Sequence, residues 1–221
     1  MKSAVLTLAI ALGATSVASA ARKMPENVTV VKRNSVVEDS SAYNRMDKDV
    51  TISYQLTGIA VVPSNGLNVG YFLNRNTILQ LEYAEGKMGF TDFDIKARTI
   101  GANAKYFFGN SFYGKGGVAY RSVGVYNLEC VSCKAGSRID LGSADSVGAE
   151  VAIGNQWQWE YFTLGCDWLG AMVPFSTTKV ANNAKAAGVS DDTNKEIDDI
   201  WNRIGKTTSI QLLRFYLGAS F

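Results

Sequence analysis

The sequence predicts an all-β fold, in which eight antiparallel strands close into an up-and-down barrel that crosses a membrane. Three observations predict it. Apolar and polar residues alternate in eight segments from Val50 onward. Between these segments, short connections alternate with connections that are mostly longer. The chain ends on Phe221. A period of two marks a strand whose two faces meet different surroundings. In a transmembrane barrel these surroundings are lipid outside and a polar lumen inside.

The first 20 residues predict a cleaved secretory signal. Lys2 gives it a basic start, an apolar stretch runs from Ala4 to Val17, and small residues precede the expected cleavage before Ala21. A membrane anchor is the alternative, but Gly, Thr and Ser residues interrupt the apolar stretch. We expect residues 21–49 to form a periplasmic extension and residues 50–221 to form the barrel; a short strand at NVTVV in the extension is the alternative.

The 201 residues that follow the signal are enough for one domain. The formal net charge falls from +2 to +1 because Lys2 leaves with the signal. A charge this close to zero gives no electrostatic footprint for nucleic acid. The mature part also lacks an apolar run long enough for a transmembrane helix, which leaves strands as the way to cross a membrane.

Each predicted strand places apolar residues at alternate positions. In chain order the strands are residues 50–61, 67–73, 77–86, 98–108, 112–123, 146–154, 157–171 and 208–221. In the third, Leu79, Leu81 and Tyr83 oppose Gln80 and Glu82. In the last, Arg214 lies on the face opposite to its apolar neighbours.

The connections indicate which rim of the barrel faces which side. Tight turns, NRN, GNS and NQ, follow the second, fourth and sixth strands, whereas the other connections are PSNG and roughly residues 86–95, 124–145 and 174–206. Antiparallel pairing places all the tight turns at the rim that also holds both chain ends. Short periplasmic turns and longer extracellular loops are typical of outer-membrane barrels, and closure removes the unpaired edge that lipid would not tolerate.

Aromatic residues fall in two bands. One lies near the tight turns and includes Tyr71, Phe107 and Trp159, while Tyr83 and Trp168 belong to a band near the longer loops. Two such bands are favoured at the two interfaces between lipid and water. The alternative is a soluble barrel or sandwich whose apolar face points inward; the terminal Phe221, the signal and the loop asymmetry favour the membrane.

Charged residues are expected on the inner face. The predicted luminal charges are Glu82, Lys105, Lys115, Arg121, Glu150, Asp167 and Arg214. Eight strands leave an interior that side chains just fill, and a buried charge without a partner is costly. We therefore expect a salt-bridge network that plugs the barrel; the alternative is a gate whose pairs exchange to admit small solutes.

Asp167 is the least regular of these charges. The alternation changes phase between Trp159 and Phe162, and keeping the first phase would place Asp167 in lipid. A β-bulge near Tyr161 or Phe162 would turn Asp167 inward, which we expect.

The three cysteines predict at most one disulfide. Cys130 and Cys133 lie in the third long loop, where an oxidising compartment would allow a small disulfide; two free thiols are the alternative. We expect no metal site, because two Cys without His do not complete a zinc set. Cys166 is expected to face lipid as a small apolar residue.

The chain contains no histidine. Activation of a Ser or Asp nucleophile by the usual route is then unavailable, and the chain has no Gly-rich phosphate loop. The sequence therefore predicts neither an enzyme nor a cofactor.

The last long loop contains a predicted helix. Thr193 and Glu196 form a capping-box pattern, and Gly205 is a stop signal. One face carries apolar residues, including Ile200 and Trp201, and we expect it to pack on the barrel mouth or at the membrane interface. A partner-binding patch is the alternative.

Three stretches carry a resemblance to a known family. They are NVGYFLNRNTILQLEYAEG, GANAKYFFGNSFYGKGGVAYRS and LLRFYLGASF, and they resemble the small outer-membrane β-barrels of Gram-negative bacteria, the OmpA/OmpX-like group. The likeness covers roughly residues 50–221. It implies a bacterial outer-membrane location reached through the periplasm, lipid around the barrel, and insertion by the barrel-assembly machinery.

The same resemblance implies an assembly signal in the last strand. Its positions are occupied by Leu213, Phe215, Leu217, Ala219 and Phe221. Ala219 departs from the pattern, because an aromatic residue is common there. The expected role is structural or surface-interacting, with the extracellular partner unidentified; the alternative is a narrow, porin-like passive channel.

Overall fold

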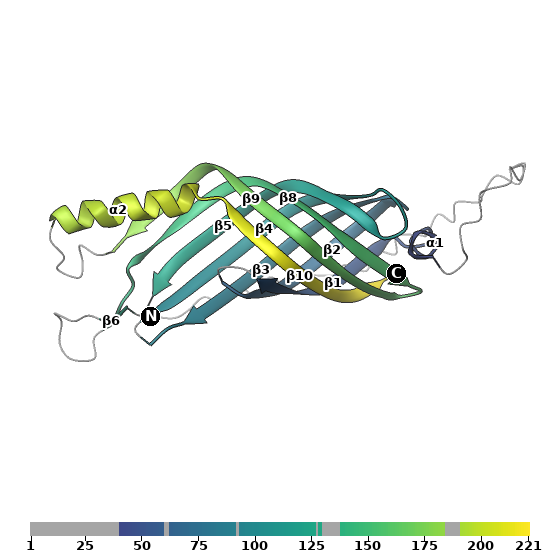
Figure 1. Ribbon diagram of the computed structural model, residues 1–221, viewed down its shortest axis with the longest axis horizontal. Coiled ribbons are helices and arrows are strands. Elements are labelled where there is room, and N and C mark those ends of the chain that lie inside the picture. The colour runs from purple at the N-terminus through teal and green to yellow at the C-terminus, as the bar shows by residue number, and fades with distance from the viewer. Residues whose placement is uncertain (1–39, 60–61, 92, 127, 130–137, 184–190) are drawn as a thin grey trace, which may run out of the picture. The chain divides into compact units, whose positions relative to one another are not determined.

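The computed structural model describes residues 40–59, 62–91, 93–126, 128–129, 138–183 and 191–221 (Figure 1). The predicted secretory signal and residues 21–39 lie outside the described residues, as do Cys130 and Cys133. Neither described helix is long and apolar enough to cross a membrane.

Eight strands form one closed antiparallel barrel, which confirms the predicted fold (Figure 1). They are β1 (Val50–Ile59), β2 (Ser64–Asn74), β3 (Thr77–Gly89), β4 (Asp94–Phe107), β5 (Phe112–Tyr126), β8 (Gly142–Trp159), β9 (Phe162–Asn182) and β10 (Ser209–Ser220). Each pairs with the barrel strand before and after it along the chain. β1 also pairs with β10, from Thr51 opposite Ser220 to Ile59 opposite Leu212, and this seam closes the ring.

The remaining elements lie at the two ends of the barrel. They are α1 (Ser41–Asn44), the two-stranded hairpin of β6 (Leu128–Glu129) and β7 (Arg138–Ile139), and α2 (Asp191–Lys206). α2 confirms the helix predicted in the last loop and ends beside Gly205, the expected stop. The side chain of Thr193 is not among those described. α1 and the hairpin were not predicted, because both are too short to show a periodic pattern.

The turn between β8 and β9 lies elsewhere than predicted. Trp159 pairs with Phe162, so the turn consists of Glu160 and Tyr161, and Glu160 has φ 35°. The prediction of a turn at Asn155-Gln156 is therefore wrong, because these residues continue β8.

Asn155 and Gln156 stay in the strand because their amides have partners on both sides of the wall. Asn155 accepts from Trp168 Nε1 at 2.8 Å outside, and Gln156 accepts from Tyr216 OH at 3.0 Å inside. The predicted bulge near Tyr161 is also wrong. The alternation of inward and outward residues changes phase at the turn. The pairing register of β9 against β8 shifts farther from this turn, at Trp168.

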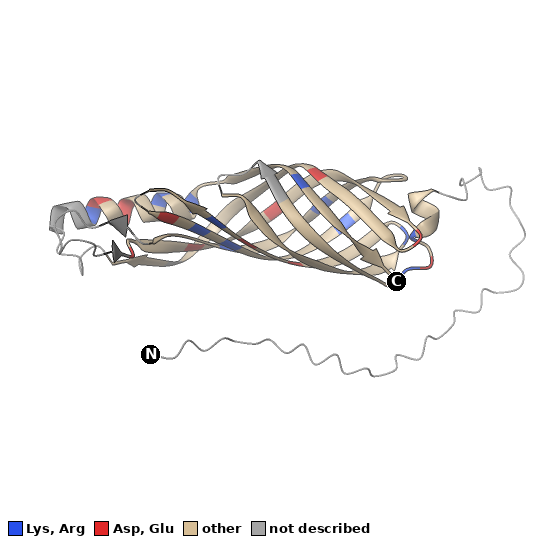
Figure 2. Cartoon of the chain, turned by 90° about the horizontal axis from the view of Figure 1, so that it is seen from below, with Lys and Arg blue, Asp and Glu red and all other residues tan. Residues whose placement is uncertain are grey.

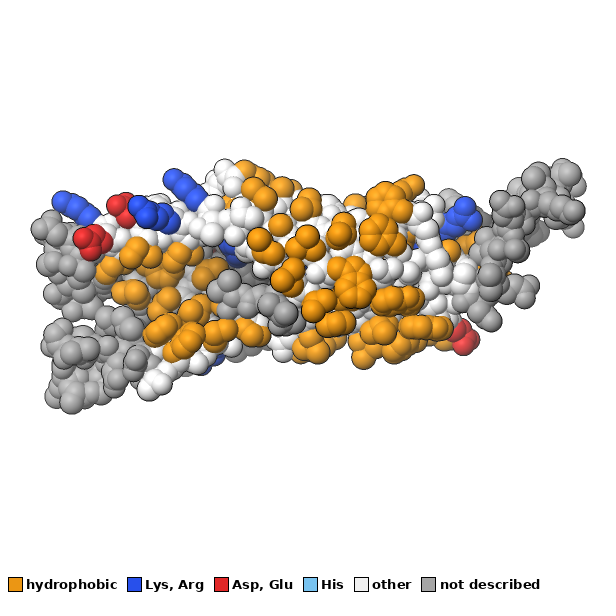
Figure 3. Space-filling model, viewed as in Figure 1, with side chains coloured by type: hydrophobic (Ala, Val, Ile, Leu, Met, Phe, Trp, Pro, Cys, Tyr) orange, Lys and Arg blue, Asp and Glu red, His pale blue; other side chains and the backbone are white. Residues whose placement is uncertain are grey.

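The wall of the barrel turns its apolar side chains outward (Figure 3). Leu81 is 66% exposed and Leu217 is 51% exposed, whereas the inward Gln55 and Gln80 are 0% and 4% exposed. A soluble barrel would bury these leucines and solvate these glutamines. The opposite arrangement is that of a barrel surrounded by lipid.

Above this apolar belt the alternation inverts. In β4 the outward positions change from the apolar Ile100 to the exposed Arg98 and Lys96, and the inward positions change from the buried Asn103 to the half-buried Ile95. β8 and β9 contain 18 and 21 residues, whereas about 9–11 residues cross a bilayer. The outer parts of these strands therefore extend beyond the membrane.

Candidate functional site

Six neighbouring strands each carry one charged residue about midway along the barrel (Figure 2), and each of these side chains is buried. We call this set the luminal charge cluster: Glu82 of β3, Lys105 of β4, Lys115 of β5, Glu150 of β8, Asp167 of β9 and Arg214 of β10. All six are buried. The cluster contains three carboxylates and three cationic side chains, so its formal charges balance.

Arg214 contacts all three carboxylates. It lies directly opposite Asp167 in the sheet, and its Nε donates to Asp167 Oδ2 at 2.8 Å. Nη2 pairs with the same carboxylate and lies 3.5 Å from Glu150 Oε1, while Nη1 donates to Glu82. The planar guanidinium allows this, because its five N–H donors point along fixed directions.

Lys115 contacts the same three carboxylates from another side. Its Nζ lies 2.6 Å from Glu150 Oε1, 3.3 Å from Glu82 Oε2 and 3.6 Å from Asp167 Oδ2, and its side chain is 0% exposed. Three carboxylates this close repel one another unless cations lie between them. Arg214 and Lys115 together supply those cations, so each depends on the other.

Lys105 lies in a different environment from Arg214 and Lys115. It lies directly opposite Lys115 in the β4–β5 pair, where two like charges are unfavourable. Its Nζ turns toward the rings of Tyr216 and Tyr113, at 4.1 and 4.8 Å from their centroids, and donates to Gln156 Oε1 at 3.4 Å. Within the described part of the chain, Lys105 has no carboxylate within 4 Å, and the two ring faces stabilise its cation instead.

Tyr113 and Tyr216 connect this environment to the carboxylates. Tyr113 OH donates to Asp167, and Tyr216 OH lies 3.1 Å from Tyr113 OH. The Tyr216 ring rests on Gly165, where an added Cβ would lie 2.0 Å from Tyr216 Cζ. Sequence reasoning did not assign these two tyrosines to the site, although they share strand parity with Lys115 and Arg214.

Arg121 lies outside the luminal charge cluster, contrary to its predicted place among the luminal charges. It donates to the main-chain oxygens of Ile204 at 3.2 Å and Thr207 at 2.9 Å, at the C-terminal end of α2. A helix leaves its last carbonyls without intrahelical partners, and a buried cation satisfies them well. Arg121 therefore holds α2 to the outer mouth of the barrel.

The last strand is less regular than predicted. Phe215, Leu217 and Phe221 are 47%, 51% and 60% exposed on the outer wall. Leu213 has φ 54° and is half-buried, so it does not share their outward row. Ala219 is also half-buried.

Cys166 differs from its prediction as well. It is a free cysteine that is only 1% exposed, so its thiol is buried and not open to lipid.

Large apolar side chains fill the lumen near the tight turns. They are Phe72, Ile78, Phe107, Tyr113 and Tyr216, which form one buried cluster. The aromatic band of this rim is therefore formed by other rings, such as Tyr71 and Trp159, which are 53% and 48% exposed.

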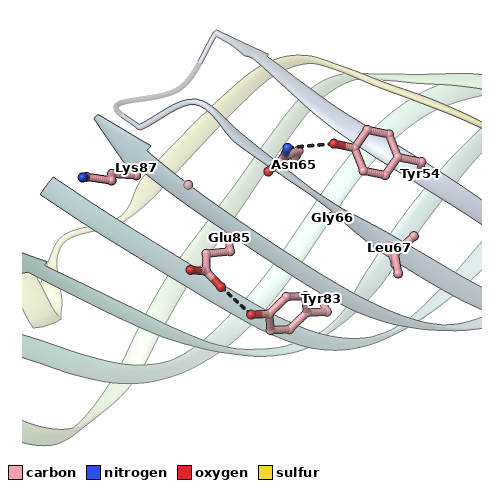
Figure 4. Close-up of a pocket in the computed structure, with 8 residues that line it drawn as sticks. Tyr54, Asn65, Gly66, Leu67, Tyr83, Glu85 and Lys87 are labelled. Carbon is pink, nitrogen blue, oxygen red and sulfur yellow. Dashed lines mark hydrogen bonds between the residues drawn. The ribbon is translucent and has the colours of Figure 1, made fainter. Parts of the chain in front are cut away.

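A shallow hollow of about 430 Å³ marks the outer wall at the upper end of the apolar belt (Figure 4). Tyr54 OH accepts from Asn65 Nδ2 at 2.7 Å, and Tyr83 OH donates to Glu85 Oε2 at 2.6 Å. Tyrosines with an apolar body and a bonded hydroxyl suit the interface of lipid and water. Lys87 continues this polar edge outward.

In the described part of the chain, no three His, Cys, Asp or Glu side chains are grouped so that they could hold a metal ion. The carboxylates of the luminal charge cluster are instead engaged by Arg214 and Lys115.

The sequence matches no protein-family model and no curated protein. Among solved structures, the chain is similar to the N-terminal β-barrel domain of OprF from Pseudomonas aeruginosa, with 14% identity over 79% of this chain and 98% of that one and a TM-score of 0.46. It is also similar to Ail, the attachment invasion locus protein of Yersinia pestis (14%, 80% and 100%, TM-score 0.45), and to Neisserial surface protein A (15%, 78% and 95%, TM-score 0.43). The fold assignment rests on the closed strand order of the chain itself.

Proposed function

We propose that the chain is an integral protein of the bacterial outer membrane with a structural or surface-interaction role, and that the luminal charge cluster closes its lumen. The observation that carries this proposal is the cluster itself. Six strands contribute to it, and the side chains of Lys115, Glu82 and Arg214 are only 0%, 1% and 4% exposed.

The energetics of burial support a closed lumen. Separating these ions would leave carboxylates unpaired in a space with few water molecules, which is costly. Polar amides occupy the same part of the lumen, and Asn103 Nδ2 lies 3.5 Å from Glu82 Oε2. Opening a path for solutes would require several of these contacts to break together.

The outer extension of the barrel supports a surface role. A barrel that only anchors itself needs about 9–11 residues in each strand. Here β8 and β9 continue beyond that length and carry α2, whose Trp201 is buried and whose Ile200 is 54% exposed. Such an extension presents a defined surface to the outside.

The pairing of the luminal carboxylates supports a non-enzymatic role. Glu82, Glu150 and Asp167 are each held by Arg214 and Lys115, so none is free to transfer a proton to a substrate. The absence of histidine from the sequence supports the same proposal.

A narrow passive channel is the second candidate. Lys105 lies beside the cluster with aromatic rather than acidic neighbours, and Glu150 Oε2 has no hydrogen-bond partner among the described residues. An exchange of partners between Lys105 and Arg214 could then open the lumen.

Planar-bilayer recording distinguishes the two candidates. Purified protein is first compared on a gel with and without boiling, because a mobility shift marks a folded barrel. We expect the folded protein to be electrically silent. Reproducible single-channel steps would instead favour the channel.

We also propose that the last strand is read by the barrel-assembly machinery. Phe215, Leu217 and the terminal Phe221 form an outward apolar row, and Phe221 bonds to the start of β1 through its main chain. Deletion of Phe221 is expected to reduce the heat-modifiable barrel in outer-membrane fractions. Phe90→Ala, at a 50% exposed position outside the last strand, is the control, and normal assembly without Phe221 would contradict this proposal.

A further inference from the structure

Residues 40–49, which we call the cap segment, lie across the tight turns of the barrel. Ala42 N donates to Asn110 Oδ1 at 2.9 Å in the β4–β5 turn. At the end of β8, Gln158 N donates to Ser41 Oγ at 3.0 Å, and Asn44 Nδ2 donates to Gln158 O at 2.9 Å. The cap segment therefore contacts both the β4–β5 turn and the end of β8.

Arg45 is the centre of this contact. Its guanidinium donates to the main-chain oxygens of Arg75 at 3.0 Å, Asn110 at 2.8 Å and Gly109 at 3.3 Å, in two different turns. It also lies 3.8 Å from the centroid of the Phe107 ring, and the residue is 1% exposed. A planar fork stacked on an aromatic face suits an arginine and not a lysine.

Burial lowers the pKa of Arg45 to about 10. Because this is still well above neutral pH, the side chain keeps its charge and its donors under ordinary conditions. The three carbonyl oxygens and the ring of Phe107 therefore hold a cation.

The side chains at the strand ends next to the cap segment are unusually well covered. Gln158, Thr163 and Ser220 are 0%, 1% and 0% exposed, although they lie at the end of the barrel. Their hydroxyl and amide groups bond to one another, with Thr163 Oγ1 2.7 Å from Gln158 Oε1. Polar side chains at an open mouth would meet water, so this mouth is closed.

The root of the cap segment is held by main-chain hydrogen bonds, among them that from Phe72 N to Asp49 O at 2.8 Å. Asp49 N and Val50 N donate to Phe221 O at 2.6 and 3.0 Å, at the seam of β1 and β10. Before this point, α1 is a single turn of four residues, which is too short to persist without its contacts. Loss of the Arg45 contacts should therefore free the cap segment while its root stays in place.

We propose that the cap segment is a separable plug of the periplasmic mouth, latched by Arg45 and arranged in series with the luminal charge cluster. Its release exposes the polar side chains of this rim to water and leaves the luminal charge cluster intact. The proposal of this plug does not depend on whether the luminal charge cluster plugs or gates the barrel. It also gives the N-terminal extension a function at the barrel itself.

Cysteine labelling in lipid nanodiscs tests this plug. The native cysteines are first replaced by Cys130→Ser, Cys133→Ser and Cys166→Ala, and Ser220→Cys is added as the reporter. A membrane-impermeant sulfonated maleimide should react slowly with this reporter. Arg45→Ala should raise the labelling rate by about tenfold or more, because local opening then exposes the thiol.

Two further reporters separate local release from loss of the barrel. Ser146→Cys, at a position that is 0% exposed on the other side of the cluster, should stay slow with and without Arg45. Asn74→Cys, at the exposed last residue of β2, should react quickly in both. An unchanged rate at position 220 in Arg45→Ala would overturn the plug, and so would a parallel increase at position 146.

Variants within the cap segment complete the test. Lys48→Ala removes a cation that lies 4.1 Å from the Tyr161 ring, and should leave the reporter slow. Arg45→Lys should give an intermediate rate. If Arg45→Ala fails to assemble, Ser41→Ala with Asn44→Ala removes the contacts to Gln158, and the same increase at position 220 is required of it.

Discussion

At each end of the barrel a guanidinium donates to main-chain oxygens and fastens a helix, with the parts of wall and helix exchanged. At the periplasmic end, Arg45 belongs to the cap segment and the rim supplies the main-chain oxygens. At the outer end, Arg121 belongs to the wall and α2 supplies the oxygens. A buried guanidinium can therefore fasten a helix to a barrel from either side.

The difference lies in what else holds each helix. α1 has four residues and depends on polar contacts, whereas α2 has 16 residues and buries Trp201 to 1% exposure. α2 also contacts β9 through Gly205, where an added Cβ would lie 2.8 Å from Thr177 Cγ2. We expect the cap segment to be released by the loss of one arginine, and α2 to be held mainly by packing.

The largest effect is expected in the luminal charge cluster between the two ends. Arg214→Ala leaves three buried carboxylates with Lys115 as their direct cationic partner. Removing one member of a buried ion network costs about 3–5 kcal/mol, so the midpoint of urea unfolding should fall.

A charge-balanced variant is the control for this prediction. Arg214→Met combined with Asp167→Asn removes one charge of each sign, and should recover part of the lost stability. If Arg214→Ala unfolds at the same urea concentration as the wild type, the cluster is not a stabilising plug. The middle of the barrel would then contribute no more to global stability than its ends.

A smaller effect is expected for Trp201→Ala at the outer end. The indole packs against Gly142, whose φ of 146° favours glycine, and its removal leaves a cavity under α2. Loss of a buried Trp typically costs about 3–5 kcal/mol. Here we expect the lower part of that range, because α2 can detach without unfolding the barrel.

Hydrogen exchange of the α2 amides measures this effect. Ile200→Ala, at an exposed position of the same helix, should leave exchange nearly unchanged. Equal exchange in Trp201→Ala and the wild type would contradict the view that packing holds this end.

The smallest effect is expected for Arg121→Ala. Two hydrogen bonds from a charged donor are lost, each worth about 1.5–3 kcal/mol, but water can reach the freed carbonyls of α2 and offset much of the loss. We expect faster exchange in the last turn of α2 and a small decrease in global stability. Release of the whole helix would instead show that the two arginines act alike.

Much of the wall could be predicted from the sequence, because each strand repeats one physical rule. Alternation placed Glu82, Lys115 and Arg214 on inward positions, and the structure has them there. The rule fails where a polar side chain finds a partner within the sheet. Asn155 and Gln156 look like a turn, but their amides bond across the wall to Trp168 and Tyr216.

The contacts of Arg45 and Arg121 could not be predicted in the same way. A sequence shows which charges share a face, but the partners of Arg121 and Arg45 are carbonyl oxygens, which every residue carries. Arg45 also lies outside any periodic segment. The sequence predicts Arg121 among the ion pairs of the lumen. The structure shows instead that Arg121 donates hydrogen bonds to the end of α2.

The inverted alternation of β4 fixes the depth of the barrel in the bilayer. A shift of two residues inward would carry Arg98 into hydrocarbon, and a shift outward would lift Ile100 into water. Both movements cost free energy, so the strand has one preferred height and a matching bilayer thickness. The chain should therefore remain anchored at that level and accumulate in membranes whose thickness fits its belt.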